Sequence, residues 1–185
     1  MSSYCDYAAD HPIHQSYHDT EYGFPTRDET VLFERLSLEI MQAGLSWEIV
    51  LKKRATMNNA FDGFDVDKVA AYGDTDVQRL LGDPGIIRNR LKVAAIIENA
   101  KRFQAMREEG GIVAWLDEHH PMPKTRWMKV FKKTFKFTGG EIVNEFLMST
   151  GYLPGTHDES CPVFARIDKL SPPWRQVALD SFVES

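Results

Sequence analysis

The chain has little cysteine and no long hydrophobic run, and each absence excludes a class of protein. Two cysteines in 185 residues cannot build a disulfide scaffold, and free thiols fit a reducing compartment. No apolar stretch approaches the length that crosses a bilayer, and the start, Met-Ser-Ser-Tyr-Cys-Asp, lacks the pattern of a signal peptide. We therefore expect a cytoplasmic protein without a membrane partner.

Alternating strand patterns and internal repeats are also nearly absent. Apolar residues recur at helical spacing instead, in a composition that is 43% hydrophobic and 26% charged. The sequence predicts an all-α protein, a single domain over 1–185 and a monomer. Helices are expected over about 27–43, 46–60, 65–72, 75–81, 89–110, 125–134 and 139–150, with irregular structure over 1–24 and a last helix from Trp174 in a tail at 162–185.

Each cysteine is accompanied by a histidine, and the two pairs lie at opposite ends of the chain. Cys5 precedes His18 by thirteen residues, and His157 precedes Cys161 by four. Two thiolates and two imidazoles complete a tetrahedral ligand set for zinc, with no position left for a substrate. The alternative is two buried thiols with incidental histidines, but the short His-x3-Cys spacing favours a structural zinc site.

The basic residues are gathered although the net charge is −5. Residues 124–136 contain six lysines and arginines and no acid, and shorter basic clusters lie at 52–54 and 88–92. A charge run is usually a solvated face, but three such runs in one acidic protein indicate a surface for phosphate groups.

Residues 75–100 have the pattern of a helix, a tight hairpin and a second helix. Gly85 permits the sharp turn, and amide groups at the start of the second helix could bind an anion. With Arg88, Arg90 and Lys92 beside it, that anion would be a DNA phosphate, contacted without reading the base sequence. An ordinary packing unit of two helices is the alternative.

Glu39 lies on a helix that is apolar over most of its circumference. A carboxylate is costly to bury there unless it has a partner or a function. Pairing with Arg35 or an exposed helix end are the alternatives. The next turn, Gln42-Ala-Gly-Leu-Ser-Trp47, is expected to expose Leu45 and Trp47, and apolar wedges beside positive charge suit proteins that open a base stack.

These motifs together resemble the 3-methyladenine DNA glycosylase I family, zinc-binding helix-hairpin-helix enzymes. The resemblance covers about residues 5–161 and is most specific at 42–47 and in the cysteine and histidine quartet. It implies a monofunctional enzyme of base excision repair, which flips an alkylated base out of double-stranded DNA and hydrolyses its N-glycosidic bond. It further implies that zinc is held by Cys5, His18, His157 and Cys161.

The resemblance also assigns the pocket. It makes Glu39 the catalytic glutamate of the pocket, Trp47 the stacking tryptophan and Tyr17 a pocket tyrosine. It also makes Gly44 and Leu45 the turn that probes the gap left by the flipped base. A 3-alkylated adenine is cationic in DNA and leaves as a neutral base, so stacking and one negative charge suit it.

This chain departs from the family at several positions. His14 stands where the family has a second pocket tyrosine, Tyr7 and Tyr22 stand where tryptophan is usual, and Leu91 replaces a glycine after the hairpin. We expect His14, Tyr7 and Tyr22 to contact the base. A protonated imidazole would repel a cationic base, so excision is expected to fall as the pH drops through the titration of His14.

Two other functions fit part of the sequence. A non-catalytic, zinc-stabilised protein could bind alkylated or distorted DNA through the same metal site, basic runs and wedge. A zinc-stabilised interaction module without DNA would leave the basic runs unexplained. Glu39 beside Trp47 favours an enzyme, because a binding protein does not need a buried acid.

Overall fold

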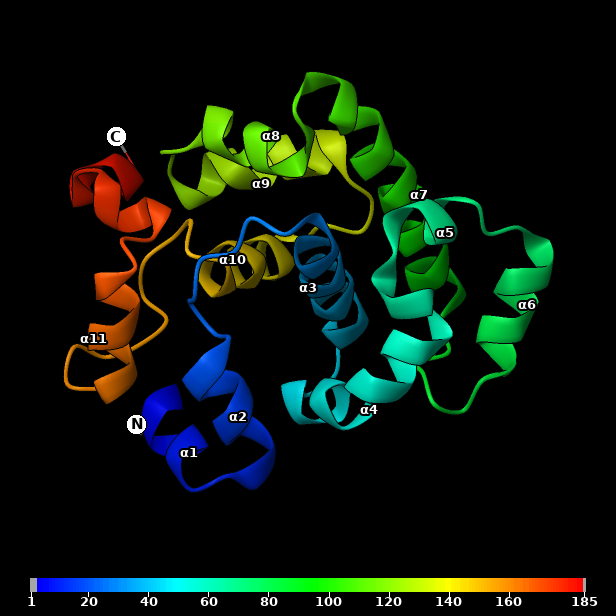
Figure 1. The fold of residues 1–185 in the computed structure, drawn as a ribbon, viewed down its shortest axis with the longest axis horizontal. Helices are drawn as coiled ribbons and strands as arrows, with labels where there is room; N and C mark the ends of the chain where they lie inside the picture. The colour runs from blue at the N-terminus through cyan, green and yellow to red at the C-terminus, as the bar shows by residue number, and fades with distance from the viewer. Residues whose placement is uncertain (1–2, 185) are drawn as a thin grey trace.

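The computed structural model describes residues 3–184, and every regular element within that range is a helix (Figure 1). This confirms the all-α prediction. The α-helices are α1 (Tyr4–Ala9), α2 (Pro12–Thr20), α3 (Glu29–Gln42), α4 (Trp47–Ala60), α5 (Val66–Ala70), α6 (Asp74–Gly82), α7 (Arg90–Met106), α8 (Gly111–His119), α9 (Lys124–Thr134), α10 (Gly140–Ser149) and α11 (Pro162–Lys169). Short 3-10 helices lie at Asp62–Phe64, Arg107–Glu109, Pro173–Gln176 and Leu179–Phe182.

Side chains at the helix starts explain why several boundaries follow from the sequence. Asp28, Ser46, Asp65 and Asn89 each accept a hydrogen bond from a backbone N–H two or three residues later, at the starts of α3, α4, α5 and α7. Such caps satisfy amide groups that the first helical turn leaves unpaired. The helices that begin at these caps were all predicted.

Three segments differ from the sequence prediction. The first 24 residues are not irregular, because Ser3 and Asp6 form a capping box that starts α1 and Pro12 begins α2. Residues 111–119 form α8, which was not predicted. The tail contains α11 and two 3-10 turns rather than a helix from Trp174, and the Trp174 amide donates to the Gly151 carbonyl at 3.1 Å.

Helix α3 runs through the middle of the molecule, between α10 on one side and α4, α5 and α7 on the other (Figure 1). Its buried side chains face several directions, and they include Leu32, Phe33, Leu36, Leu38, Ile40 and Met41. Burial around the whole helix leaves Glu39 inside the protein, as the sequence pattern indicated.

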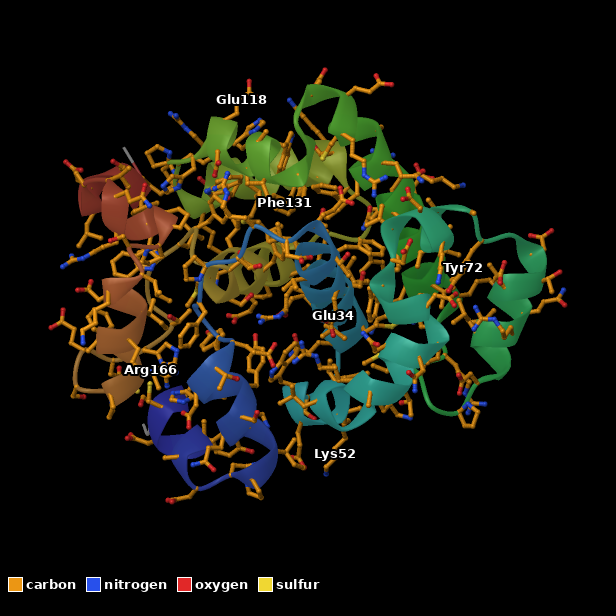
Figure 2. All side chains as sticks on the ribbon, in the orientation of Figure 1. Glu34, Lys52, Tyr72, Glu118, Phe131 and Arg166 are labelled. Carbon is orange, nitrogen blue, oxygen red and sulfur yellow. The ribbon has the colours of Figure 1, made fainter. Side chains whose placement is uncertain are left out.

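Helix α11, near the C-terminal end of the chain, lies beside the N-terminal helices α1 and α2 at one side of the molecule (Figure 1). Arg166 of α11 points toward the N-terminal helices (Figure 2), and its Nη1 donates to the Asp19 carbonyl at 3.0 Å. Its guanidinium also lies 5.4 Å from the ring centre of Phe24. Within residues 3–184 no helix is both long and apolar enough to cross a bilayer.

Candidate active site

A pocket of about 280 Å³ opens where α1, α2, α3, α4 and α10 converge. Its size suits one small aromatic molecule rather than a polymer segment. Its lining combines aromatic rings with two acids and one amide, contributed by Tyr4, Tyr17, Tyr22, Glu39, Gln42, Trp47 and Glu145. Glu39 and Trp47, which the sequence pattern singled out, thus lie beside Tyr17 and Tyr22, which the family resemblance implied.

The aromatic residues form the walls of this pocket. The ring of Tyr17 lies 5.2 Å from Trp47 and 5.6 Å from Tyr22, centroid to centroid. Tyr4 meets Tyr22 edge to face at 5.3 Å. Such walls favour a flat ring, and their electron-rich faces favour a cationic one. The indole N–H of Trp47 is buried and has no hydrogen-bond partner among residues 3–184.

Glu39 is only 4% exposed, and within residues 3–184 no donor forms a hydrogen bond with its carboxyl group. Its alternative partner, Arg35, donates instead to Glu21 at 2.8 Å. Burial raises the pKa of Glu39 well above its usual range, the Glu145 carboxyl adds to the increase, and the Arg35 guanidinium partly offsets it. An acid kept without a partner beside a cavity is a candidate for function.

Glu145 is a pocket residue that the sequence analysis missed. It is half-buried on α10 and accepts a hydrogen bond from the Tyr22 hydroxyl at 3.2 Å. Burial raises the pKa of Glu145, and hydrogen bonds from Tyr22 and Asn144 only partly offset the increase. The signal that revealed Glu39 was present here too, because Glu145 lies within the apolar run of α10.

Two expected base contacts are corrected. His14 is buried but does not line the pocket, because Tyr4 lies there with its Oη 3.0 Å from His14 Nδ1. Tyr7 is 47% exposed and packs on His11, with ring centres 5.0 Å apart. Tyr4 therefore supplies an aromatic wall that His14 does not.

The expected pH response of His14 is not supported either. Burial lowers the pKa of His14, and the nearby His11 adds to the decrease. The imidazole is therefore neutral near neutral pH, and Tyr4 separates it from the pocket.

The four predicted metal ligands come together between the chain ends. Cys5 Sγ lies 3.7 Å from His157 Nδ1, and Cys161 Sγ lies 3.8 Å from the same nitrogen and 3.9 Å from His18 Nε2. Ligands about 2.0–2.3 Å from a tetrahedral zinc ion are roughly 3.5 Å apart. The ligand spacing is therefore close to that of a zinc site.

Neighbouring groups orient the two imidazoles toward this cluster. His18 Nδ1 donates to Asp19 Oδ1 at 2.7 Å, which leaves Nε2 facing the cysteines. His157 Nε2 donates to the Tyr22 carbonyl at 2.7 Å, which leaves Nδ1 facing them. Outer partners of this kind fix the tautomer of a metal-binding histidine. The hydrogen bond from His157 to the Tyr22 carbonyl also connects the cluster to the pocket, because Tyr22 lines the pocket.

A groove of about 1170 Å³ meets the pocket at Gln42. One side of the groove is the turn after α3, where Gly44 has a φ of 79° that favours glycine. Leu45, the next residue, is 38% exposed. The other side carries Lys129, Lys132 and Lys136. A basic groove beside an exposed apolar side chain thus leads to the aromatic pocket.

The sequence matches the methyladenine glycosylase family over residues 7–130. It is 37% identical over 177 residues to "DNA-3-methyladenine glycosylase 1" of Escherichia coli (strain K12), covering 85% of this chain and 94% of that protein. It is 34% identical to "DNA-3-methyladenine glycosylase" of Haemophilus influenzae, covering 88% and 98%. A solved structure of a tyrosine-to-phenylalanine variant of 3-methyladenine DNA glycosylase I, in complex with 3-methyladenine, matches with a TM-score of 0.78 and 30% identity, covering 86% of this chain and 96% of that one.

This chain belongs to the methyladenine glycosylase family. In this methyladenine glycosylase the segment after α6 turns tightly and leads into α7, with Arg88 and Arg90 exposed beside the turn. Gly85 packs against α4, where an added Cβ would lie 3.0 Å from the Thr56 Cβ. Asn89 Oδ1 accepts from two amides at the start of α7, so those groups are not free for an anion.

Lys92 was expected to contact a DNA phosphate, but its side chain is buried and points into the protein. It is 4% exposed, and its Nζ donates to the Met41 carbonyl at 2.8 Å and the Ala43 carbonyl at 2.6 Å. The ammonium group thereby satisfies carbonyls at the end of α3, directly before the turn that carries Gly44 and Leu45.

The basic cluster at 52–54 is largely engaged by other groups of this methyladenine glycosylase. Lys53 Nζ donates to the Pro84 carbonyl at 2.7 Å, and Arg54 is engaged by two acids. Lys52 points outward from α4 (Figure 2) and pairs with Glu48. The lysines of the groove remain as candidates for contact with phosphate groups.

Replacing Lys92 with methionine is expected to destabilise the protein. The change keeps the aliphatic chain but leaves two carbonyl oxygens without their donor, at a cost of about 2 kcal/mol. Urea unfolding at neutral pH measures the free energy of unfolding. Arg88→Met, on the exposed side of the same segment, should change it by less than about 0.5 kcal/mol. Equal stability of the Lys92→Met variant and the unmodified protein would show that these hydrogen bonds are dispensable.

Proposed function

We propose that this chain is a DNA glycosylase that excises 3-methyladenine from double-stranded DNA by hydrolysing the N-glycosidic bond. The observation that carries the proposal is the unpartnered Glu39 carboxyl among aromatic walls, in a chain of the methyladenine glycosylase family. Relatives named for this activity cover most of the chain, and one similar structure holds 3-methyladenine.

The pocket suits the chemistry of an alkylated purine. Alkylation at N3 makes the ring cationic while it is attached to the sugar, so the base leaves as a neutral molecule and needs little help from an acid. The rings of Tyr17 and Trp47 would stack on the cation. Ionised Glu39 would stabilise positive charge on the base and on the oxocarbenium-like sugar as the bond breaks.

The groove supplies the route by which a base would reach this pocket. A base inside a duplex is inaccessible, so an enzyme of this kind must rotate it out of the stack. Leu45 would enter the gap, and Gln42 lies at the junction of groove and pocket. We assign α6, the hairpin and α7 to a helix-hairpin-helix unit, in which Arg88 and Arg90 contact the DNA backbone.

We further propose that Cys5, His18, His157 and Cys161 hold a structural zinc ion. The four ligand atoms lie within 4.8 Å of one another. The set leaves no position for a substrate, and its imidazoles are oriented by Asp19 and the Tyr22 carbonyl. Zinc would therefore join α1 and α2 to the segment before α11 and hold Tyr22 in the pocket wall.

Base release from methylated duplex DNA, with the released bases identified, tests the proposed function. A glycosylase of this type should release 3-methyladenine and leave an abasic site without cutting the strand. A protein that binds the same DNA but releases no base would be the non-catalytic binding protein instead.

The groove lysines give a separate prediction. Lys132→Ala is expected to weaken binding of any duplex by about three- to tenfold and to reduce the slope of log K against log salt by about one. Lys133→Ala is the matched control, because Lys133 is also exposed on α9 but does not line the groove. Fluorescence anisotropy at several salt concentrations measures both. Weakening confined to lesion-bearing DNA would contradict a backbone contact.

A further inference from the structure

The pocket contains two carboxyl groups, on helices far apart in sequence. Glu39 comes from α3 and Glu145 from α10, and both line the cavity with the aromatic rings. One acid suffices to balance one positive charge, so the second needs an explanation. Glu145 is not tied into an ion pair within residues 3–184; its partners are the hydroxyl of Tyr22 and the amide of Asn144.

We propose that Glu145 is a specificity residue of the base pocket, which together with Glu39 selects a cationic N-alkylpurine over a neutral purine. This inference rests on the proposed function and names its substrate class. N3-alkyl and N7-alkyl purines carry a positive charge while bonded to deoxyribose, and the released bases are neutral. The carboxyl pair would thus hold the substrate more tightly than the product.

The proton balance of the pair follows from its surroundings. One buried and one half-buried carboxyl group in the same cavity do not both ionise easily, because like charges repel in a medium of low polarity. The pKa of each is raised, chiefly by burial. Both shifts favour a proton on the empty pair, so the pair keeps a proton to higher pH than exposed carboxyl groups do. When a cationic ring enters, its charge replaces that proton, which passes to solvent.

Two cationic side chains near the two carboxyl groups each have an acidic partner of their own. Arg35 is bound to Glu21, and Lys124 pairs with Glu141 at 3.4 Å. Burial raises the pKa of the three pocket tyrosines, which therefore stay neutral and act as hydrogen-bonding walls. The remaining groups that face the two carboxyls are Tyr4, Tyr17, Tyr22, Asn144, Gln42 and Trp47.

Binding of two small probes tests the proposal without cleavage. The 3,9-dimethyladeninium cation carries a methyl group in place of the sugar, and 3-methyladenine is the neutral counterpart. Calorimetry at pH 8 should show that Glu145→Gln weakens binding of the cation by about tenfold and of the neutral base by less than about twofold. Glu118→Gln is the control, because Glu118 is exposed on α8 and lies outside both the pocket and the groove.

Two further measurements keep the proposal falsifiable. Wild-type protein should release protons when it binds the cation, measured in buffers of different ionisation enthalpy, and should release none with the neutral base. Its affinity for the cation should rise with pH and then level off, as the pair loses its proton. Absence of proton release, or equal affinity of a folded Glu145→Gln variant for the cation, would overturn the inference.

The proposed function is tested separately by base release. One outcome is that the wild-type protein excises 3-methyladenine and the Glu145→Gln variant keeps the full preference for the cation. This outcome would refute the role of Glu145 but not the proposed function. Wild-type protein that selects the cation but releases no base from methylated DNA would refute the enzymatic function and leave the carboxyl pair as a recognition site.

Discussion

Replacing Cys161 with serine is expected to abolish stoichiometric zinc binding and to lower the melting temperature by about 10 °C. The proposed ion links Cys5 to Cys161 and so closes a loop that spans most of the chain, a constraint of about 4 kcal/mol by analogy with a disulfide. In a chain of this size 1 kcal/mol corresponds to about 2–4 °C. Elemental analysis and thermal unfolding, with and without a chelator, measure the two effects.

The neighbouring residue provides the control for this experiment. Ser160 is exposed and its side chain is not among the four ligands, so Ser160→Ala should keep one equivalent of zinc and the original melting temperature. Chelation should lower the melting temperature of the wild type and leave that of Cys161→Ser nearly unchanged. A Cys161→Ser protein that retains zinc and stability would show that the quartet does not bind the metal.

Replacing Glu39 with glutamine is expected to slow base release by about a hundredfold or more while leaving DNA binding unchanged. Glutamine keeps the shape of the side chain but cannot supply negative charge to the base and the sugar in the transition state. Single-turnover excision from methylated duplex DNA measures the rate, and anisotropy measures binding. Unchanged kinetics in the variant would remove Glu39 from the mechanism.

The same substitution should make the protein more stable at neutral pH. Because the pKa of Glu39 is raised on folding, the folded state binds more protons than the unfolded state above pH of about 4. The stability associated with this carboxyl is therefore present at low pH and is lost as the pH rises through the folded pKa. Glutamine has no such loss, so the stability difference in favour of Glu39→Gln should grow with pH.

Glu34 offers a matched comparison on the same helix. Its carboxylate accepts a hydrogen bond from Arg54 Nε at 2.9 Å and lies outside the pocket. Glu34→Gln should therefore excise at the wild-type rate and should lose a little stability rather than gain it. Greater stability without activity, in Glu39→Gln only, would identify Glu39 as an acid retained for function.

Much of the fold could be predicted because its signals are local. Helical spacing and the capping residues Ser46, Asp65 and Asn89 depend on neighbours within a few positions, and the structure has the helices that they predict. The helix expected from about residue 27 begins instead after the cap Asp28. Helix α1 also has a local signal, the capping box formed by Ser3 and Asp6, which was overlooked.

Part of the candidate site was equally accessible from the sequence. Glu39 was evident as an acid in an apolar helix, and Trp47 follows in the next turn, so one short segment brings both to the pocket. The cysteine and histidine pairs were evident from their ligand chemistry. The structure places them together, although residues 5 and 161 are far apart in the chain.

Only the tertiary structure decided which side chains from distant segments face the pocket. Tyr4 lies in the place expected for His14, Glu145 adds a second acid from α10, and Lys92 turns inward to the end of α3. Sequence spacing defines which face of a helix a residue occupies but not what packs against that face. Because burial and hydrogen bonding depend on that contact, the direction of Lys92 and the surroundings of Glu145 are set by packing between helices rather than by the local sequence.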